Sequence, residues 1–116
     1  MSTVTKIALS GSTNGQPIKI VRTSTPGTTI HDCHATSIDT LFLTVTNTSG
    51  GAVAFTIEKG GTTNPDNLVV DAYSVPADGY PYALPAMIGT GSINIDGFGG
   101  SANVLLVDGF VNRFTS

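Results

Sequence analysis

Charged residues are scarce in this chain of 116 residues: Asp, Glu, Lys and Arg make up only 11% of it, whereas a soluble domain has about 25%. Glutamate occurs once, at Glu58, and tryptophan is absent. Strong helix formers are therefore rare, but 17 Thr, 10 Ser and 14 Gly are present. Threonine favours half-buried strands and glycine favours tight turns. The composition predicts an all-β protein.

Basic residues are too few and too scattered for a phosphate-binding patch. The net charge is −3 with a pI near 4.9, and the basic residues are Lys6, Lys19, Arg22, Lys59 and Arg113. Nucleic-acid binding requires a basic patch or stripe, so we expect none. A membrane helix needs about 20 consecutive apolar residues, and no stretch approaches that length. We therefore expect no membrane partner.

Cys33 is the only cysteine, which excludes a disulfide within the chain. The sequence begins at Met1 without a basic and then apolar leader, which predicts synthesis and folding in a cytoplasm. The length suits one domain over residues 1–116, with a folded surface of about 6,000 Å² and no need for covalent cross-links.

Apolar residues recur at every second position, which is the period of a strand. Strands are expected over residues 3–9, 18–23, 29–35, 39–46, 53–58, 68–73, 92–96 and 103–110. About eight short antiparallel strands separated by turn signals indicate a single β-sandwich, similar to a jelly roll. The segment Asn47–Gly51 predicts a hairpin between two of these strands, and Gly97–Ser101 predicts a further turn.

The segment His31-Asp-Cys-His34 is the one place where imidazole and thiol groups lie close in sequence. Zinc sites combine two such pairs, but a second pair is missing here. Strand alternation also sends His31 and Cys33 to one face and His34 to the other. These three residues are weak candidate ligands, and the sequence predicts no bound metal or other cofactor.

No catalytic constellation emerges either. Cys33 has no helix N-terminus or cationic neighbour in sequence to lower its thiol pKa, and its adjacent histidines are not the distant partners that catalytic cysteines use. Four aspartates, Asp66, Asp78, Asp96 and Asp108, lie beside Gly, Asn or Pro, where side chains usually bind local backbone donors. Calcium binding at these aspartates stays open as an alternative, but no motif supports it, since no D-x-D-x-D-G run occurs. We expect a protein without enzymatic activity.

Two segments are candidates for contact with a protein partner. Tyr80-Pro81-Tyr82 and Leu84 form a proline-rich stretch, and tyrosines supply large contact area with few rotatable bonds. The stretch would serve equally well as a cover for one end of the sandwich. Residues 1–5, with Thr3 and Val4 as contact candidates, could pair as an edge strand or reach a neighbouring subunit as an arm.

Three stretches, Val45–Val53, Thr56–Leu68 and Val107–Arg113, resemble small structural proteins of tailed-bacteriophage virions, of the kind that decorate or cement the capsid. The resemblance implies a β domain on the capsid surface that binds the major capsid protein and stabilises the virion. It also implies a homo-oligomer, with a trimer favoured over a dimer. The alternative is a receptor- or glycan-binding module of a head fibre or tail, since jelly-roll domains serve both purposes.

Overall fold

The computed structural model describes residues 2–116 and is built from strands, as the composition predicted. Ten strands are present in this part of the chain. They are β1 (Thr3–Ile7), β2 (Ile18–Lys19), β3 (Thr28–Asp32), β4 (Ile38–Asn47), β5 (Val53–Lys59), β6 (Leu68–Val75), β7 (Tyr82–Ala83), β8 (Met87–Gly89), β9 (Asn94–Gly99) and β10 (Leu105–Thr115). Over residues 2–116, no helix has the length and apolar character needed to cross a membrane.

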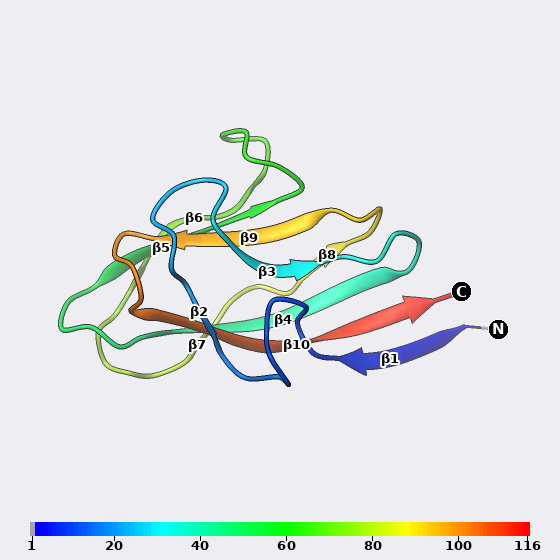
Figure 1. Ribbon diagram of the computed structural model, residues 1–116, viewed down its shortest axis with the longest axis horizontal. Coiled ribbons are helices and arrows are strands. Elements are labelled where there is room, and N and C mark those ends of the chain that lie inside the picture. Colours follow the sequence, from blue (N-terminus) through cyan, green and yellow to red (C-terminus); the bar gives the residue numbers. More distant parts are fainter. Residues whose placement is uncertain (1) are drawn as a thin grey trace.

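The strands form two sheets that face each other as a β-sandwich (Figure 1). The large sheet has the order β1-β10-β4-β7, with β2 added to β10 and β8 added to β4. The small sheet has the order β3-β9-β5-β6. All pairings are antiparallel. The predicted all-β sandwich is therefore confirmed, and the accessible surface of 5974 Å² agrees with the area expected from the chain length.

Strand β4 shows why the residues fold this way. Its buried and less buried residues alternate along its whole length, so that Leu41, Leu43 and Val45 enter the core. They meet Phe55 and Ile57 of the small sheet in one continuous apolar cluster. Alternation of this kind lets one face of a strand pack while the other faces outward. The inward positions Ile18 and Ile20 expected from the sequence are also buried.

The predicted hairpin between residues 39–46 and 53–58 is wrong. Strand β4 belongs to the large sheet and β5 to the small sheet, so residues 48–52 carry the chain across the sandwich. The Asn47 side chain supports this crossing by donating to the carbonyls of Gly51 and Val75, each at 2.9 Å. Two strands with one apolar face each can pair side by side or stack face to face, and alternation does not distinguish these arrangements.

The predicted turn at Gly97–Ser101 is wrong in its first three residues, because β9 continues through Gly99. A Cβ atom at Gly97 would lie 2.9 Å from a ring carbon of Phe55, and one at Gly99 would lie 2.8 Å from a methyl carbon of Leu105. These glycines make room for core side chains instead of turning the chain. Two strands not expected from the sequence, β7 and β8, are short pieces on the edge of β4.

Strands β1 and β10 run together to one end of the elongated molecule, where the described N-terminal residues and the C-terminus lie side by side (Figure 1). Thr3 pairs with Thr115 and Ile7 with Val111. Residues 3–5 of the candidate N-terminal arm are thus an edge strand of the large sheet, and Met1 lies outside the described residues.

Gly109 of β10 provides a test of this packing, because a Cβ atom there would lie 2.0 Å from the carbonyl oxygen of Phe42 in β4. Neither backbone can yield without breaking the central strand pair, so Gly109→Ala is expected to lower the free energy of unfolding by at least about 3 kcal/mol. Urea denaturation measures this. The control Gly50→Ala, which has nothing within 4 Å, should change it by less than about 0.5 kcal/mol. Equal urea midpoints for Gly109→Ala and Gly50→Ala would contradict the close approach of Gly109 to the Phe42 backbone.

Candidate functional site

A buried polar cluster joins the two sheets. His31 comes from β3 of the small sheet, Asp39 from β4 and Arg113 from β10 of the large sheet. The His31 Nε2 atom lies 2.8 Å from Asp39 Oδ2, and the guanidinium of Arg113 binds both carboxylate oxygens, at 2.7 and 2.9 Å. The side chains of His31 and Asp39 are completely covered, while Arg113 keeps a quarter of its side chain exposed. Of these three side chains, only that of Arg113 reaches solvent.

Hydrogen bonds define the protonation of His31. Its Nδ1 atom accepts from the backbone N–H of Ser10 at 3.0 Å, so this nitrogen carries no proton. The ring proton therefore sits on Nε2, which donates to Asp39. The imidazole is neutral, and both of its nitrogens are used within the protein.

Asp39 receives more hydrogen bonds than any other side chain of the cluster. Burial by itself raises the pKa of its carboxyl, but the hydrogen bonds from Arg113, from His31 and from the backbone N–H of His34 outweigh burial. Together they lower the pKa from 3.8 to about 2. The carboxylate is therefore charged and fully paired at neutral pH.

Cys33 lies against this cluster, and the potential ligand atoms of His31, Cys33 and Asp39 are all within 4.8 Å of one another. The sequence placed His31 and Cys33 on one side and His34 apart from them, and the described geometry agrees. The Nδ1 atom of His34 instead accepts from the backbone of Thr36 and Ser37, at 3.1 and 2.9 Å. Asp39, the third member, was not foreseen as a partner, because it follows in the next strand and only the sandwich brings it to β3.

The three residues offer one nitrogen, one sulfur and one oxygen, but the cluster is poorly suited to a metal ion. A cation would have to displace Arg113 from the carboxylate or compete with its positive charge. Burial, followed by the charge of Asp39, raises the pKa of the Cys33 thiol to about 11, whereas both metal ligation and nucleophilic attack require the thiolate. The arrangement is best explained as a buried network that joins β3, β4 and β10.

The candidate contact segment around Tyr80 divides into exposed and packed parts. The Tyr80 ring is 64% exposed and lies edge-on to Tyr82, with ring centroids 5.8 Å apart. The Tyr82 hydroxyl donates to Asp78, and Leu84 packs against the core while its backbone N–H binds the carbonyl of Leu43 at 3.0 Å. Pro81, which separates the two tyrosines in sequence, is exposed. Of this segment, Tyr80 and Pro81 are free to contact a partner.

The outward face of the large sheet carries a second group of apolar side chains. We call it the outer apolar face; its exposed members are Val4, Ile38, Phe42, Ile88 and Phe114. Val4 stands opposite Phe114, and Phe114 opposite Ile38, so one row crosses three strands. Phe42 stacks on Phe110 with ring centroids 5.1 Å apart. Val4 and Ile88 are the most exposed members of this face, at 65% and 56%.

Only Val4 of this face was a contact candidate from the sequence, and its neighbour Thr3 points to the other side of β1. The sequence did contain a signal for this face, because Ile38 and Phe42 are large apolar residues at outward positions of β4. An outward position occupied by a large apolar residue departs from the usual polar face of an antiparallel sheet.

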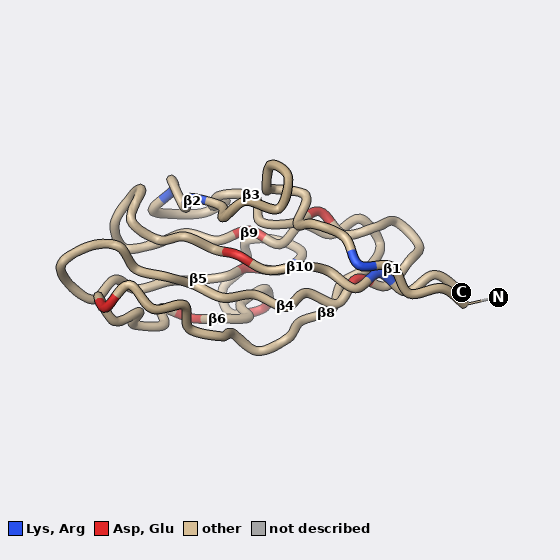
Figure 2. Tube along the Cα trace, turned by 90° about the horizontal axis from the view of Figure 1, so that it is seen from below, with Lys and Arg blue, Asp and Glu red and all other residues tan. Residues whose placement is uncertain are grey.

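Charged residues are few, and most of the tube in Figure 2 is uncharged. Comparison with protein-family models, with curated proteins and with solved structures found no match to this chain.

The buried network predicts a specific response to acid. Because the pKa of Asp39 is about 2 in the folded protein and 3.8 without these contacts, its stabilisation is complete above about pH 5 and is lost as the pH falls from about 4 to 2. We expect the loss to reach about 1–2 kcal/mol, allowing for the partial exposure of Arg113. Urea denaturation from pH 2 to pH 7 measures it.

Asp39→Asn is the matching variant. It removes the charge, so its stability at pH 7 should fall by about 3 kcal/mol, because Arg113 and His31 lose their charged acceptor. The free energy of unfolding of Asp39→Asn should change less between pH 4 and pH 2 than that of the wild type. The exposed Asp66→Asn serves as the control with wild-type behaviour. An identical acid profile for wild type and Asp39→Asn would refute the assignment.

Proposed function

We propose that this chain is a capsid decoration protein of a tailed bacteriophage, which binds the outer surface of the major capsid lattice and stabilises the virion. The observation that carries the proposal is the outer apolar face, which presents Val4, Ile38, Phe42, Ile88 and Phe114 on one side of the sandwich. Contiguous exposed apolar groups on a protein surface mark sites of association. The proposed role is thus adhesive.

The composition supports this role. Charged residues are depleted at the centre of protein interfaces, where aromatic residues are enriched. The outer apolar face contains two exposed phenylalanines, and the Nζ atom of Lys6 lies 4.7 Å from the centroid of the Phe110 ring. Lys6 thereby covers an aromatic ring while keeping its charge at the border of the face.

The proposed protein would stabilise the capsid because its binding is thermodynamically linked to capsid assembly. A protein that binds only the assembled capsid lattice shifts the equilibrium towards that lattice, and repeated copies act together. In this proposal the chain acts as a homo-oligomer, and a trimer is favoured over a dimer. Strand β1 supports self-association, since one of its edges pairs with β10 and no strand of residues 2–116 pairs with the other.

Binding to purified capsids tests the proposal. Capsids lacking this chain are mixed with it and sedimented, and the bound copies are counted against the major capsid protein. We expect close to one copy per capsid subunit. Phe42→Ser combined with Phe114→Ser should weaken binding at least about tenfold, because aromatic anchors dominate interface energies.

Val21→Ser is the control, since Val21 is 47% exposed but lies outside the strands of the large sheet. It should bind like the wild type. No sedimentation of wild-type protein with capsids would refute the proposed role, and equal losses in both variants would refute the proposed binding face.

The second candidate is a glycan- or receptor-binding module of a fibre or tail, favoured by the exposed Tyr80 beside Tyr82 and Asp78. Aromatic rings stack on apolar ligand faces while a carboxylate accepts hydrogen bonds. A glycan array distinguishes this role: a specific signal that is lost in Tyr80→Ser would favour it, and an array without signal would remove its support.

A further inference from the structure

Two buried carboxylate oxygens in the small sheet lack any hydrogen-bond partner. They are Glu58 Oε1 and Asp96 Oδ1, and no other buried side-chain oxygen or nitrogen of residues 2–116 is left in this state. Glu58 is only 3% exposed. An unpaired polar atom buried away from water destabilises the fold, and more so when it is charged, so the pair requires a physical explanation.

These two side chains face each other. Glu58 in β5 stands directly opposite Asp96 in β9, and residues in this relation point to the same side of an antiparallel sheet with Cβ atoms about 5 Å apart. Their neighbours Ile57 and Ile95 point into the core, so both carboxylates lie on the outer side of the small sheet. Aspartates beside a turn were expected to bind local backbone donors, and Asp96 departs from this expectation through its unpartnered oxygen.

The surroundings add negative charge. Burial, followed by the charges of Asp32 and Glu58, raises the pKa of the Asp96 carboxyl, and a hydrogen bond from Thr29 offsets this only in part. Asp32 of β3 stands opposite Asn94, two residues before Asp96 on the same side of β9. Three carboxylates therefore converge on one region of the sheet. Repulsion of this kind is relieved when a cation binds.

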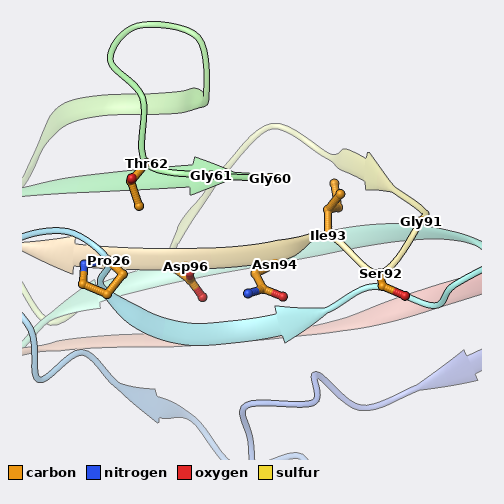
Figure 3. A pocket seen from close by; sticks show the side chains of 9 residues that line it. All are labelled: Pro26, Gly60, Gly61, Thr62, Gly91, Ser92, Ile93, Asn94 and Asp96. Carbon is orange, nitrogen blue, oxygen red and sulfur yellow. The ribbon is translucent and has the colours of Figure 1, made fainter.

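A pocket of about 380 Å³ opens beside Asp96, which lines it, while Glu58 lies behind the lining, opposite Asp96 on the neighbouring strand. Figure 3 shows Asn94 and Asp96 extending from β9, with Thr62 and the backbone of Gly60 and Gly61 on the opposite side. The lining supplies carboxylate, amide, hydroxyl and carbonyl oxygens, and it contains no histidine, cysteine or basic residue. Such a set of donors suits a hard cation and not zinc or copper.

We propose that Glu58 and Asp96 bind a calcium ion between their facing carboxylates, at the point where Asp96 meets this pocket. Their two unpartnered oxygens are the charged ligands, and the side-chain oxygen of Asn94 and water complete the coordination. Calcium fits better than magnesium, because it accepts irregular arrangements of oxygen ligands whereas magnesium requires a near-ideal octahedron. With two carboxylates the affinity should lie in the range of weak calcium modules, with a Kd of about 10⁻⁴ to 10⁻³ M.

Bound calcium would join β5 to β9 on the outer side of the small sheet, opposite the face that carries the core residues Phe55 and Ile30. It would also anchor the loop after β5, which contributes Gly60, Gly61 and Thr62 to the pocket. Calcium would thus stabilise the fold itself, independently of whether the outer apolar face of the large sheet binds a capsid.

Thermal unfolding of the full chain tests the site. After treatment with a chelator, the protein is melted in 10 mM CaCl₂ and in NaCl of equal ionic strength. Calcium should raise Tm by about 5–10 °C. Glu58→Gln and Asp96→Asn should each lose most of this rise, and Glu58→Gln should melt above the wild type without calcium because one of two facing charges is gone.

Asp66→Asn is the matched control, because it removes the same charge from an exposed position in the loop after β5. It should keep the full rise in Tm. The proposal is overturned if calcium does not raise the Tm of the wild type, if the rise persists in both Glu58→Gln and Asp96→Asn, or if magnesium produces the same rise. If Glu58→Gln does not fold, the partly exposed Asp96 decides the test through Asp96→Asn alone.

Discussion

The Asp39 carboxylate is the interaction on which the assembly of this sandwich depends. It is fully buried between the sheets, where an unpaired charge costs several kcal/mol. The cost is met only when Arg113 of β10, His31 of β3 and the backbone of His34 all reach it. Both sheets must therefore be in register before the charge is satisfied. Apolar contacts provide most of the stability, but they are less directional, so this network specifies how the sheets align.

The same residue chemistry occurs twice in the molecule with opposite outcomes. Asp39 is surrounded by donors, and its pKa is lowered to about 2. Asp96 faces Glu58, and its pKa is raised by burial and by neighbouring negative charge. The first arrangement is complete without any further group, which explains why a metal ion at His31, Cys33 and Asp39 would disturb it. The second lacks positive charge, which is the physical basis for the proposed calcium site.

Scarcity of charge shapes the surface as much as the core. With 11% charged residues in the chain, the outward positions of β4 are occupied only by isoleucine, threonine and phenylalanine. Phe42 and Phe110 stack on this surface rather than in the core. A sheet with such an outer side exposes more apolar area than scattered surface residues do. Association with a partner would cover it, which is consistent with an adhesive role.

Composition and period-two alternation determined the fold class and most strand positions, because burial of one strand face is a local property of the chain. The inward residues of β4, the burial of Ile18 and Ile20 and the separation of His34 from His31 and Cys33 all followed from that period. The glycines of β9 were misassigned, because a glycine that admits Phe55 and one that turns the chain are identical in sequence.

Tertiary structure alone decided which strands pair. The apolar faces of β4 and β5 would suit a hairpin or a crossing between sheets, and the crossing occurs because β4 pairs with β10 and β5 with β9. Long-range pairing also brought Asp39 to His31, Glu58 to Asp96 and Val4 to Phe114. Such contacts depend on strand order and register, which are set by the packing of the whole chain and leave no local pattern in the sequence.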